Sequence, residues 1–216
     1  LPNPFWVKHE FLQGVGGVLG YPTTNVRSAS DGRSTYVNFE NGRIYRWNGN
    51  LVVEIHGSIF RWHESRNGVH GEWGYPLSDL EAIGDGRGSA QWFEGGILWH
   101  TSRHGGHGIS GAVLDRYVTN GAHRGYAGYP TRGTSPVGDG RGTYATFENK
   151  AIIYASPEHG GHQVHGAVLD YYRSRGGPTG SLGYPTSELG APGGAHRYQS
   201  FEGGRIEYRS GRVTPA

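Results

Sequence analysis

The residues of this chain that are best suited to chemistry are a recurrent Asp-Gly-Arg sequence and a set of tyrosines and tryptophans. Carboxylate and guanidinium groups hydrogen-bond to hydroxyls, and aromatic rings pack on the C–H faces of sugars while their polar ends remain free to bond. These residue types have the chemistry needed to bind a sugar. The candidate ligand-binding residues are Asp31, Arg33, Tyr36, Trp47, Asp85, Arg87, Trp92, Trp99, Asp139, Arg141, Tyr144, Tyr154 and Tyr198.

Each of these groups also has a structural interpretation. An Asp side chain caps local backbone and Gly supplies a bend, so Asp-Gly-Arg is also typical of a turn. Tyr36 and Phe39 differ by three positions and lie on opposite faces of a strand. A core Phe39 would turn Tyr36 outward, toward a ligand or toward ordinary packing between repeats.

Metal binding and catalysis have weaker support. The pairs His104/His107 and His159/His162 share one spacing, but a zinc site needs three or four ligands and the chain has no cysteine. There is no Gly-x-Ser-x-Gly elbow, no His-Glu-x-x-His sequence and no phosphate loop. We therefore expect no metal, no cofactor and no enzymatic activity. A catalytic site unique to one repeat is a minor alternative.

Two short sequences divide the chain into four similar parts. Gly-Tyr-Pro recurs at intervals of 54, 54 and 55 residues, and Phe-Glu recurs every 54. Such even spacing indicates an internal repeat. The copies begin at Gly20, Gly74, Gly128 and Gly183 and at Phe39, Phe93, Phe147 and Phe201.

Each repeat is predicted to contain a helix, a corner, a loop and a β-hairpin. In the second repeat, apolar residues of 57–64 fall on one helical face, and glycines then end the helix. In the first repeat, Asn3 and Pro4 fit an N-cap followed by the first helical position. Gly-Tyr-Pro forms the corner, because Gly permits positive φ and Pro extends the residue before it. Gly-rich turns between aromatic runs, as in 35–47, predict the hairpin.

These elements predict an α+β, β-hairpin-rich repeat protein. We expect a single domain over 1–216, with repeats at approximately 3–56, 57–110, 111–165 and 166–216. Both an extended solenoid and a closed ring fit four such units. The terminal repeats are as apolar as the middle ones, which favours a closed, propeller-like ring with pseudo-fourfold symmetry.

Composition supports a packed protein with balanced charge. Gly makes up 40 of 216 residues, but 6 Trp, 14 Tyr and 7 Phe supply buried area. The formal net charge is +2, and no basic stripe suggests nucleic acid. No segment reaches the ~20 apolar residues of a membrane span. The absence of Cys and Met is compatible with an exposed, oxidising environment.

Taken together, the repeated sequences resemble the LGFP repeat, with Tyr in place of Phe in its name. The resemblance covers essentially the whole chain. The segments that carry it are Leu19-Gly20-Tyr21-Pro22, Asp85-Gly86-Arg87-Gly88, 93–99 and 164–168.

The resemblance implies a secreted or cell-wall-associated protein of actinobacterial or fungal type. It also implies a non-catalytic module that binds cell-wall polysaccharide such as arabinogalactan. We expect a monomer that binds glycan multivalently through several weak sites. The alternative is a secreted scaffold or inhibitor that binds another protein.

Overall fold

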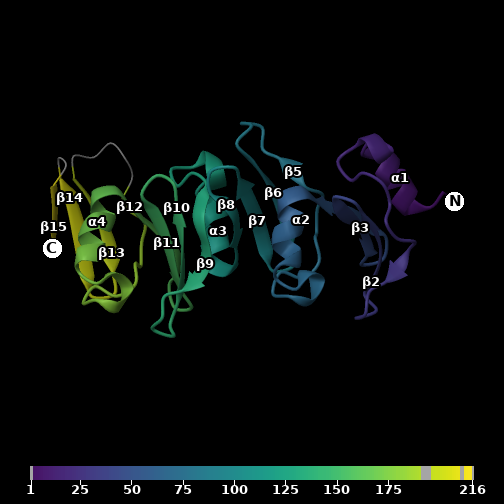
Figure 1. The fold of residues 1–216 in the computed structure, drawn as a ribbon. Helices are drawn as coiled ribbons and strands as arrows, with labels where there is room; N and C mark the ends of the chain where they lie inside the picture. Colours follow the sequence, from purple (N-terminus) through teal and green to yellow (C-terminus); the bar gives the residue numbers. More distant parts are fainter. Residues whose placement is uncertain (1, 191–195, 210–211, 216) are drawn as a thin grey trace. The chain divides into compact units, whose positions relative to one another are not determined.

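The computed structural model describes residues 2–190, 196–209 and 212–215, and its ribbon is shown in Figure 1. The chain divides into two compact units, Leu1–Gly106 and His107–Ala216. Each unit contains two repeats. The units are described separately below.

The first unit begins with a helix, and each of its two repeats follows the same order of elements. The first repeat consists of α1 (Pro4–Phe11), the 3₁₀ turn η1 (Gly14–Gly16), β1 (Arg27–Ser28), β2 (Ser34–Phe39), β3 (Gly42–Trp47) and β4 (Leu51–His56). The second consists of α2 (Gly57–Glu64), η2 (Gly68–His70), β5 (Glu81–Ala82), β6 (Gly88–Phe93) and β7 (Gly96–Thr101). The boundary between the units falls within β8 (Gly105–Ile109).

The second unit contains two further repeats, each with a helix, a 3₁₀ turn and an antiparallel hairpin. The third repeat contains α3 (Gly111–Thr119), η3 (Ala122–Arg124), β9 (Pro130–Pro136), β10 (Thr143–Phe147), β11 (Ala151–Ser156) and β12 (Gly160–His165). The fourth contains α4 (Gly166–Ser174), η4 (Gly177–Thr179), β13 (His196–Phe201), β14 (Gly204–Arg209) and β15 (Arg212–Pro215).

The predicted hairpins are present as antiparallel pairs. In the first repeat, β2 and β3 pair from Phe39↔Gly42 to Ser34↔Trp47, and β4 extends the sheet. Among the described residues the sheets have linear orders, such as β1-β2-β3-β4 and β12-β11-β10-β9. No sheet closes on itself, and the ring expected from the fourfold sequence repeat is not found in the part of the chain that the structure describes.

Local sequence explains the start of α1. The Asn3 side chain accepts a hydrogen bond of 3.0 Å from the Phe5 backbone N–H, and Pro4 opens α1. This arrangement confirms the predicted cap. The sequence did not predict the 3₁₀ turns between helix and corner, nor the short strands β1 and β5 before the Asp-Gly-Arg loops. Both kinds of element are too short to give a periodic signal.

The Gly-Tyr-Pro and Phe-Glu sequences are hydrogen-bonded to each other in every repeat. In the second, the Glu94 carboxylate accepts the Tyr75 backbone N–H at 2.9 Å, and the Glu94 N–H donates to the Tyr75 carbonyl at 3.0 Å. The glycine before the tyrosine, Gly74, has φ +62 and lies against this carboxylate, so a Cβ there would meet a Glu94 oxygen at 2.3 Å. Gly-Tyr-Pro therefore forms the structural corner that the sequence predicted.

One ring from each helix fixes this corner to the hairpin. His63 Nε2 lies 2.9 Å from the Gly74 carbonyl oxygen, and its ring lies 4.9 Å from the Phe93 ring. A carbonyl only accepts, so Nε2 carries the proton. The Tyr172 hydroxyl donates in the same way to the Gly183 carbonyl at 2.5 Å. The residues at this position are His9, His63, Tyr117 and Tyr172.

The hydrophobic core of each unit crosses the boundary between its two repeats. In the first unit, Tyr45 and Trp47 of β3 pack in one cluster with Ile59 of α2 and with Tyr75 and Phe93 of the second repeat. In the second unit, Tyr154 belongs to a cluster with Val168, Tyr184 and Phe201. The sheet of the first repeat in each unit therefore packs on the helix of the repeat that follows it in the same unit.

Candidate functional site

A network of polar side chains joins the two repeats of the first unit. The Tyr75 hydroxyl donates to the Asp31 carboxylate at 2.9 and 3.0 Å. Arg33 forms an ion pair with Glu94, and its guanidinium lies 4.9 Å from the centre of the Tyr75 ring. Trp47 stacks on the same ring at 4.8 Å. The Asp-Gly-Arg loop of one repeat thus binds the Gly-Tyr-Pro and Phe-Glu residues of the next.

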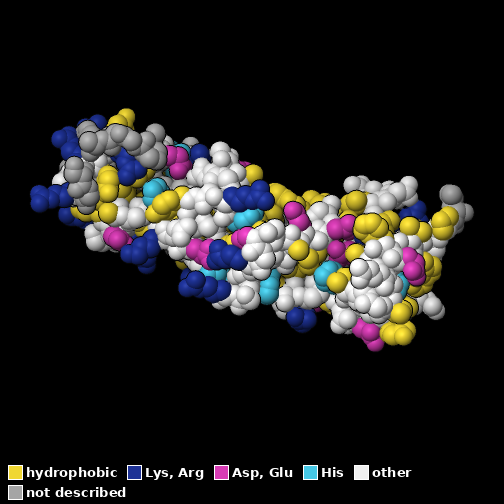
Figure 2. Space-filling view, turned by 90° about the horizontal axis from the view of Figure 1, so that it is seen from above, with side chains coloured by type: hydrophobic (Ala, Val, Ile, Leu, Met, Phe, Trp, Pro, Cys, Tyr) yellow, Lys and Arg dark blue, Asp and Glu magenta, His cyan; other side chains and the backbone are white. Residues whose placement is uncertain are grey.

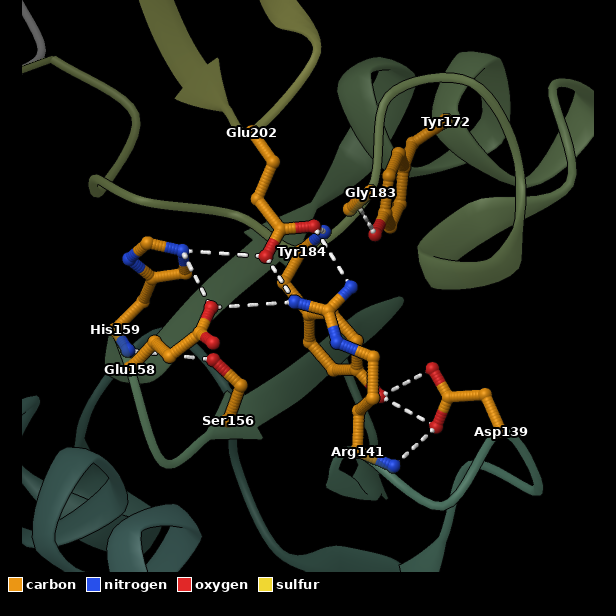
Figure 3. A network of polar contacts seen from close by, with 9 residues as sticks. All are labelled: Asp139, Arg141, Ser156, Glu158, His159, Tyr172, Gly183, Tyr184 and Glu202. Atoms are coloured by element: carbon orange, nitrogen blue, oxygen red, sulfur yellow. Dashed lines mark hydrogen bonds and ion pairs between the residues drawn. The ribbon is translucent and has the colours of Figure 1, made fainter.

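The second unit contains the same network, as Figure 3 shows. The Tyr184 hydroxyl donates to Asp139 at 2.9 and 3.0 Å, and Arg141 donates to Glu202 at 2.6 and 3.2 Å. The Arg141 guanidinium lies 5.2 Å from the centre of the Tyr184 ring. We call these two sets the inter-repeat networks. Their members are Asp31, Arg33, Tyr75 and Glu94, and Asp139, Arg141, Tyr184 and Glu202.

The networks hold their carboxylates ionised and their tyrosines neutral. Hydrogen bonding from Arg141 lowers the pKa of Glu202, and the Tyr184 backbone N–H acts in the same direction. Burial raises the pKa of the Tyr75 hydroxyl, and the nearby Asp31 carboxylate raises it further. The Asp-Gly-Arg sequence also forms the local turn that its residue types suggest, because the Arg33 backbone N–H donates to Asp31 at 3.0 Å. These loops therefore stabilise the stacking of repeats within each unit.

A groove of about 420 Å³ lies beside the network of the first unit. Tyr36 and Tyr45 form a cross-strand pair along it, with ring centres 6.0 Å apart. Arg43 lies 4.9 Å from the Tyr36 ring centre and pairs with Glu64 of α2 at 3.1 Å. The first groove is lined by Ser28, Ala29, Ser30, Tyr36, Arg43, Tyr45, Glu64, Asn67, Gly68, Val69 and His70.

A second groove, of about 540 Å³, lies at the corresponding place in the second unit. Tyr144 and Tyr154 again form a cross-strand pair with centres 6.0 Å apart, and Arg132 lies 5.4 Å from the Tyr144 ring centre. This arginine comes from β9, whereas Arg43 comes from β3. The second groove is lined by Thr131, Arg132, Val137, Tyr144, Thr146, Ile152, Tyr154, Arg173, Gly176, Pro178 and Thr179.

Both grooves combine a half-buried outer tyrosine with a buried inner one. Burial raises the pKa of Tyr45 to about 12 and that of Tyr154 to about 12, so both hydroxyls stay protonated at neutral pH. The Arg43 guanidinium donates to the Tyr45 hydroxyl at 2.6 Å. Each groove thus offers aromatic rings next to guanidinium donors, with hydroxyl groups close by.

The other candidate residues lie outside these grooves or have no exposed ring. Trp47 and Trp99 are 6% and 5% exposed and pack in the core, and Tyr154 is 6% exposed at the inner side of the second groove. A buried ring offers no free face to a sugar. Trp92 and Tyr198 are exposed, at 41% and 51%.

The remaining Asp-Gly-Arg loop forms the same local turn, since Arg87 donates its backbone N–H to Asp85 at 2.9 Å. In the fourth repeat, the corresponding residues 192–195 lie outside the described part of the chain.

A histidine and two glutamates meet in the second unit, but an arginine lies among them. His159 Nε2 is 3.2 Å from Glu202, and Glu158 is 3.3 Å from Arg141 (Figure 3). Arg141 already supplies positive charge to both carboxylates. His162 hydrogen-bonds instead to Glu188 and to the His159 carbonyl. The two histidines of the predicted pair therefore bind different partners.

Sequence reasoning missed the arginines of the grooves. Arg43 directly follows the hairpin turn, and the cross-strand register places its side chain on the same face as Tyr45. The position of the hairpin turn in the sequence was enough to predict this cross-strand register. Arg132 gave no such signal, because its strand lies in a stretch that looked like a loop.

The repeated sheets and helices, with polar networks between adjacent repeats, define a tandem repeat protein. The LGFP repeat model matches three segments, residues 19–68, 74–125 and 128–180. These matches cover more than half of the chain, and the chain belongs to the LGFP repeat family. The membership confirms the resemblance seen in the sequence.

No curated protein matches the chain. Among solved structures, a virginiamycin B lyase from Staphylococcus aureus is 12% identical, with a TM-score of 0.19 over 100% of this chain and 57% of the lyase. AztD from Citrobacter koseri is 11% identical, with a TM-score of 0.17 over 85% of this chain and 44% of AztD. The chain thus spans less than two thirds of either protein.

No helix among the described residues is both long and apolar enough to cross a membrane.

Proposed function

We propose that this chain is a non-catalytic, carbohydrate-binding module of LGFP repeats that attaches to cell-wall polysaccharide outside the cell. Arabinogalactan is the ligand that the family resemblance favours. The module binds the polymer through more than one groove. The proposal narrows the ligand-binding residues to those around Tyr36 and Tyr144.

The observation that carries the proposal is the recurrence of one groove in two units. Tyr36 and Tyr144 occupy the same strand position, each pairs with an inner tyrosine at 6.0 Å, and each lies under an arginine. The arginines come from different strands. Packing requirements alone do not explain why the same combination of groups is rebuilt from different residues.

The chemistry of the grooves suits a neutral, hydroxyl-rich ligand. Volumes of about 420 and 540 Å³ fall within the usual range for small-ligand sites, so each groove can hold a few sugar rings. Tyrosine rings pack on C–H faces, and guanidinium groups donate to ring and hydroxyl oxygens. In the first groove, Glu64 adds an acceptor for hydroxyl protons.

Retention on purified, insoluble arabinogalactan tests the proposal. The double variant Tyr36→Ala/Tyr144→Ala removes the outer ring of both grooves, and we expect its retention to fall at least tenfold. Trp92→Ala is the matched control, because it removes an exposed aromatic residue outside both grooves and should leave retention unchanged. Circular dichroism melting curves show that each variant is folded.

Two results would contradict this function. One is a wild-type protein that is retained neither on arabinogalactan nor on any polymer of a glycan array. The other is a folded double variant that is retained as well as the wild type, which would place binding elsewhere on the surface.

A further inference from the structure

The second unit contains a small cavity that is distinct from the two grooves. It has a volume of about 250 Å³ and is lined by residues of the third and fourth repeats. Its lining includes Tyr126, His165 directly before α4, and Arg197 and Tyr208 of the β13–β14 hairpin. None of these four residues lines either groove. We call them the Arg197 site.

Two pairs of closely packed groups line this cavity. The rings of Tyr126 and His165 have their centres 4.2 Å apart. The Arg197 guanidinium lies 4.7 Å from the ring centre of Tyr208, its cross-strand partner. Tyr126 is 52% exposed and the other three are half-buried, so the site is accessible from solvent.

Arg197 brings a positive charge to the site that no carboxylate neutralises within the described part of the chain. The nearby Arg205 and Arg209 both pair with Glu207, at 3.0 and 3.1 Å. Burial lowers the pKa of His165, and the charge of Arg197 lowers it further, so the histidine stays neutral and the guanidinium is the cation of the site. A guanidinium in this position can bind a carboxylate or phosphate group through two hydrogen bonds.

The surroundings of the site are also rich in positive charge. The fourth repeat contains six arginines and four acidic residues. Figure 2 shows Lys and Arg side chains gathered over this repeat. Such a surface attracts an anionic ligand more than a neutral one.

The first unit shows that a pair of repeats folds without these groups. Three members of the site have different counterparts there, namely Val18 for Tyr126, Ser89 for Arg197 and His100 for Tyr208. Ser89 and His100 are cross-strand partners, as Arg197 and Tyr208 are, so the backbone register is the same. The guanidinium and the additional tyrosines of the second unit therefore point to a ligand rather than to a requirement of the fold.

The shape of the cavity restricts the ligand to a compact organic anion. A volume of about 250 Å³ lies just below the range of ~300–1,000 Å³ for larger ligands, which suits a single sugar ring. Val168 and Leu189 add apolar surface to the lining. A bare inorganic anion makes no use of aromatic and apolar surface, whereas the C–H face of a sugar ring packs on it.

We propose that the Arg197 site binds one uronic acid residue, with its carboxylate on the Arg197 guanidinium and its ring against Tyr126 and Tyr208. This site goes beyond the neutral sugars assigned to the grooves and does not depend on them. It gives the chain a second sugar specificity, for acidic residues of a polysaccharide.

NMR titration of the whole chain with methyl glucuronide, methyl glucoside and inorganic phosphate tests the site. We expect the glucuronide to bind about tenfold or more tightly than either of the other two, because only it has both the charge and the ring. Arg197→Ser introduces the residue that the first unit carries at this position, and should weaken glucuronide binding by about tenfold or more. Arg205→Ser is the matched control, since it removes an arginine of the same hairpin outside the cavity and should leave binding unchanged.

Two further variants separate the site from the fold and from the grooves. Tyr126→Val, again the residue of the first unit, should weaken glucuronide binding even though Arg197 remains. The double variant Tyr36→Ala/Tyr144→Ala should bind the glucuronide as the wild type does, so failure of the grooves and failure of this site are distinguishable. A wild type that binds glucuronide no better than glucoside overturns the proposal. The same conclusion follows if phosphate binds as tightly as glucuronide, or if Arg197→Ser binds glucuronide as well as the wild type.

Discussion

At the scale of single residues, the tyrosine of Gly-Tyr-Pro shows how position decides the role of one residue type. Tyr21 is 60% exposed, whereas Tyr75 and Tyr184 are fully buried. The buried tyrosines donate to Asp31 and Asp139, and each also lies under an arginine. Gly-Tyr-Pro thus forms a local corner in the first repeat. In the second and fourth repeats its tyrosine also belongs to an inter-repeat network.

The Tyr75 hydroxyl offers a direct test of these networks. Tyr75→Phe keeps the ring but leaves Asp31 and Ser34 without the phenol, so we expect the unfolding free energy to fall by about 1.5–3 kcal/mol. Tyr21→Phe is the control and should change stability by less than about 0.5 kcal/mol, because that ring is exposed. Urea unfolding measures both. Equal effects of the two substitutions would contradict the assigned role.

A buried carboxyl in the first unit makes stability depend on pH in the opposite sense to the networks. Burial raises the pKa of Glu54 to about 7, and the negative charge of Asp79 adds to this, although the Leu80 N–H bonds to one oxygen at 3.0 Å. His56 Nε2 lies 3.7 Å from the other oxygen, but burial lowers the pKa of this histidine and favours its neutral form. A raised folded-state pKa gives stability that is complete below the ordinary carboxyl pKa of about 4.3 and is lost as pH rises through 7.

Glu54→Gln removes this ionisation and keeps the acceptor for Leu80. The wild type should therefore lose stability relative to the variant as pH rises from about 4 to about 7. The difference between their unfolding free energies should change by on the order of 2–3 kcal/mol in favour of the variant. Thermal melts at several pH values measure the difference. Glu81→Gln, on the exposed strand β5, should show no such trend. A constant difference between Glu54→Gln and wild type would refute the raised pKa.

At the scale of elements, the repeat tolerates changes in side-chain chemistry while keeping geometry. His9, His63, Tyr117 and Tyr172 all reach the carbonyl of the corner glycine and pack on the hairpin phenylalanine. Histidine and tyrosine both combine a flat ring with a donor at its far end. The element needs that combination rather than either residue.

The turn after each helix depends on a glycine for space. A Cβ on Gly17 would lie 1.7 Å from the Leu12 carbonyl oxygen, and one on Gly71 would lie 2.0 Å from that of Arg66. Gly17→Ala should therefore destabilise the protein by about 1–3 kcal/mol. Gly16→Ala, at the adjacent residue, meets no atom within 4 Å and should be close to neutral. Comparison of their unfolding midpoints in urea tests this steric assignment, which equal midpoints would exclude.

At the scale of the whole molecule, each unit is a pair of repeats joined by a shared core cluster, and each carries one of the two tyrosine grooves described above. Two weak sites on one chain raise the apparent affinity for a polymer with repeating sugars far above that for a short fragment. This is the property that the proposed function requires. Neither groove needs high affinity by itself.

The loss of one groove should therefore affect polymer binding more than fragment binding. For Tyr36→Ala, we expect the apparent affinity for soluble arabinogalactan to fall at least tenfold, while a short oligosaccharide still binds the remaining groove with unchanged affinity. Calorimetry with both ligands separates the two effects. If polymer and oligosaccharide affinities fall by the same factor, the grooves do not act together.

The sequence by itself determined the repeat, its elements and its corners. Asn3 and Pro4 start a helix, Gly-Tyr-Pro turns the chain, and Gly-rich turns join aromatic strands, because each of these outcomes depends on neighbouring residues. The sequence also indicated the family, because the spacing of the repeated motifs can be read without knowing which residues are in contact.

Only the tertiary structure decided which residues meet across repeats. Asp31 and Tyr75 are 44 positions apart, and nothing local indicates that the Asp-Gly-Arg loop bonds to the next corner. The same holds for Trp47. Its position in the strand pattern is compatible with an exposed ring, but in the structure Tyr75 of the next repeat stacks on it. Burial and pairing of this kind arise from the packing of one repeat on another, and a periodic sequence gives the period of that packing but not its contacts.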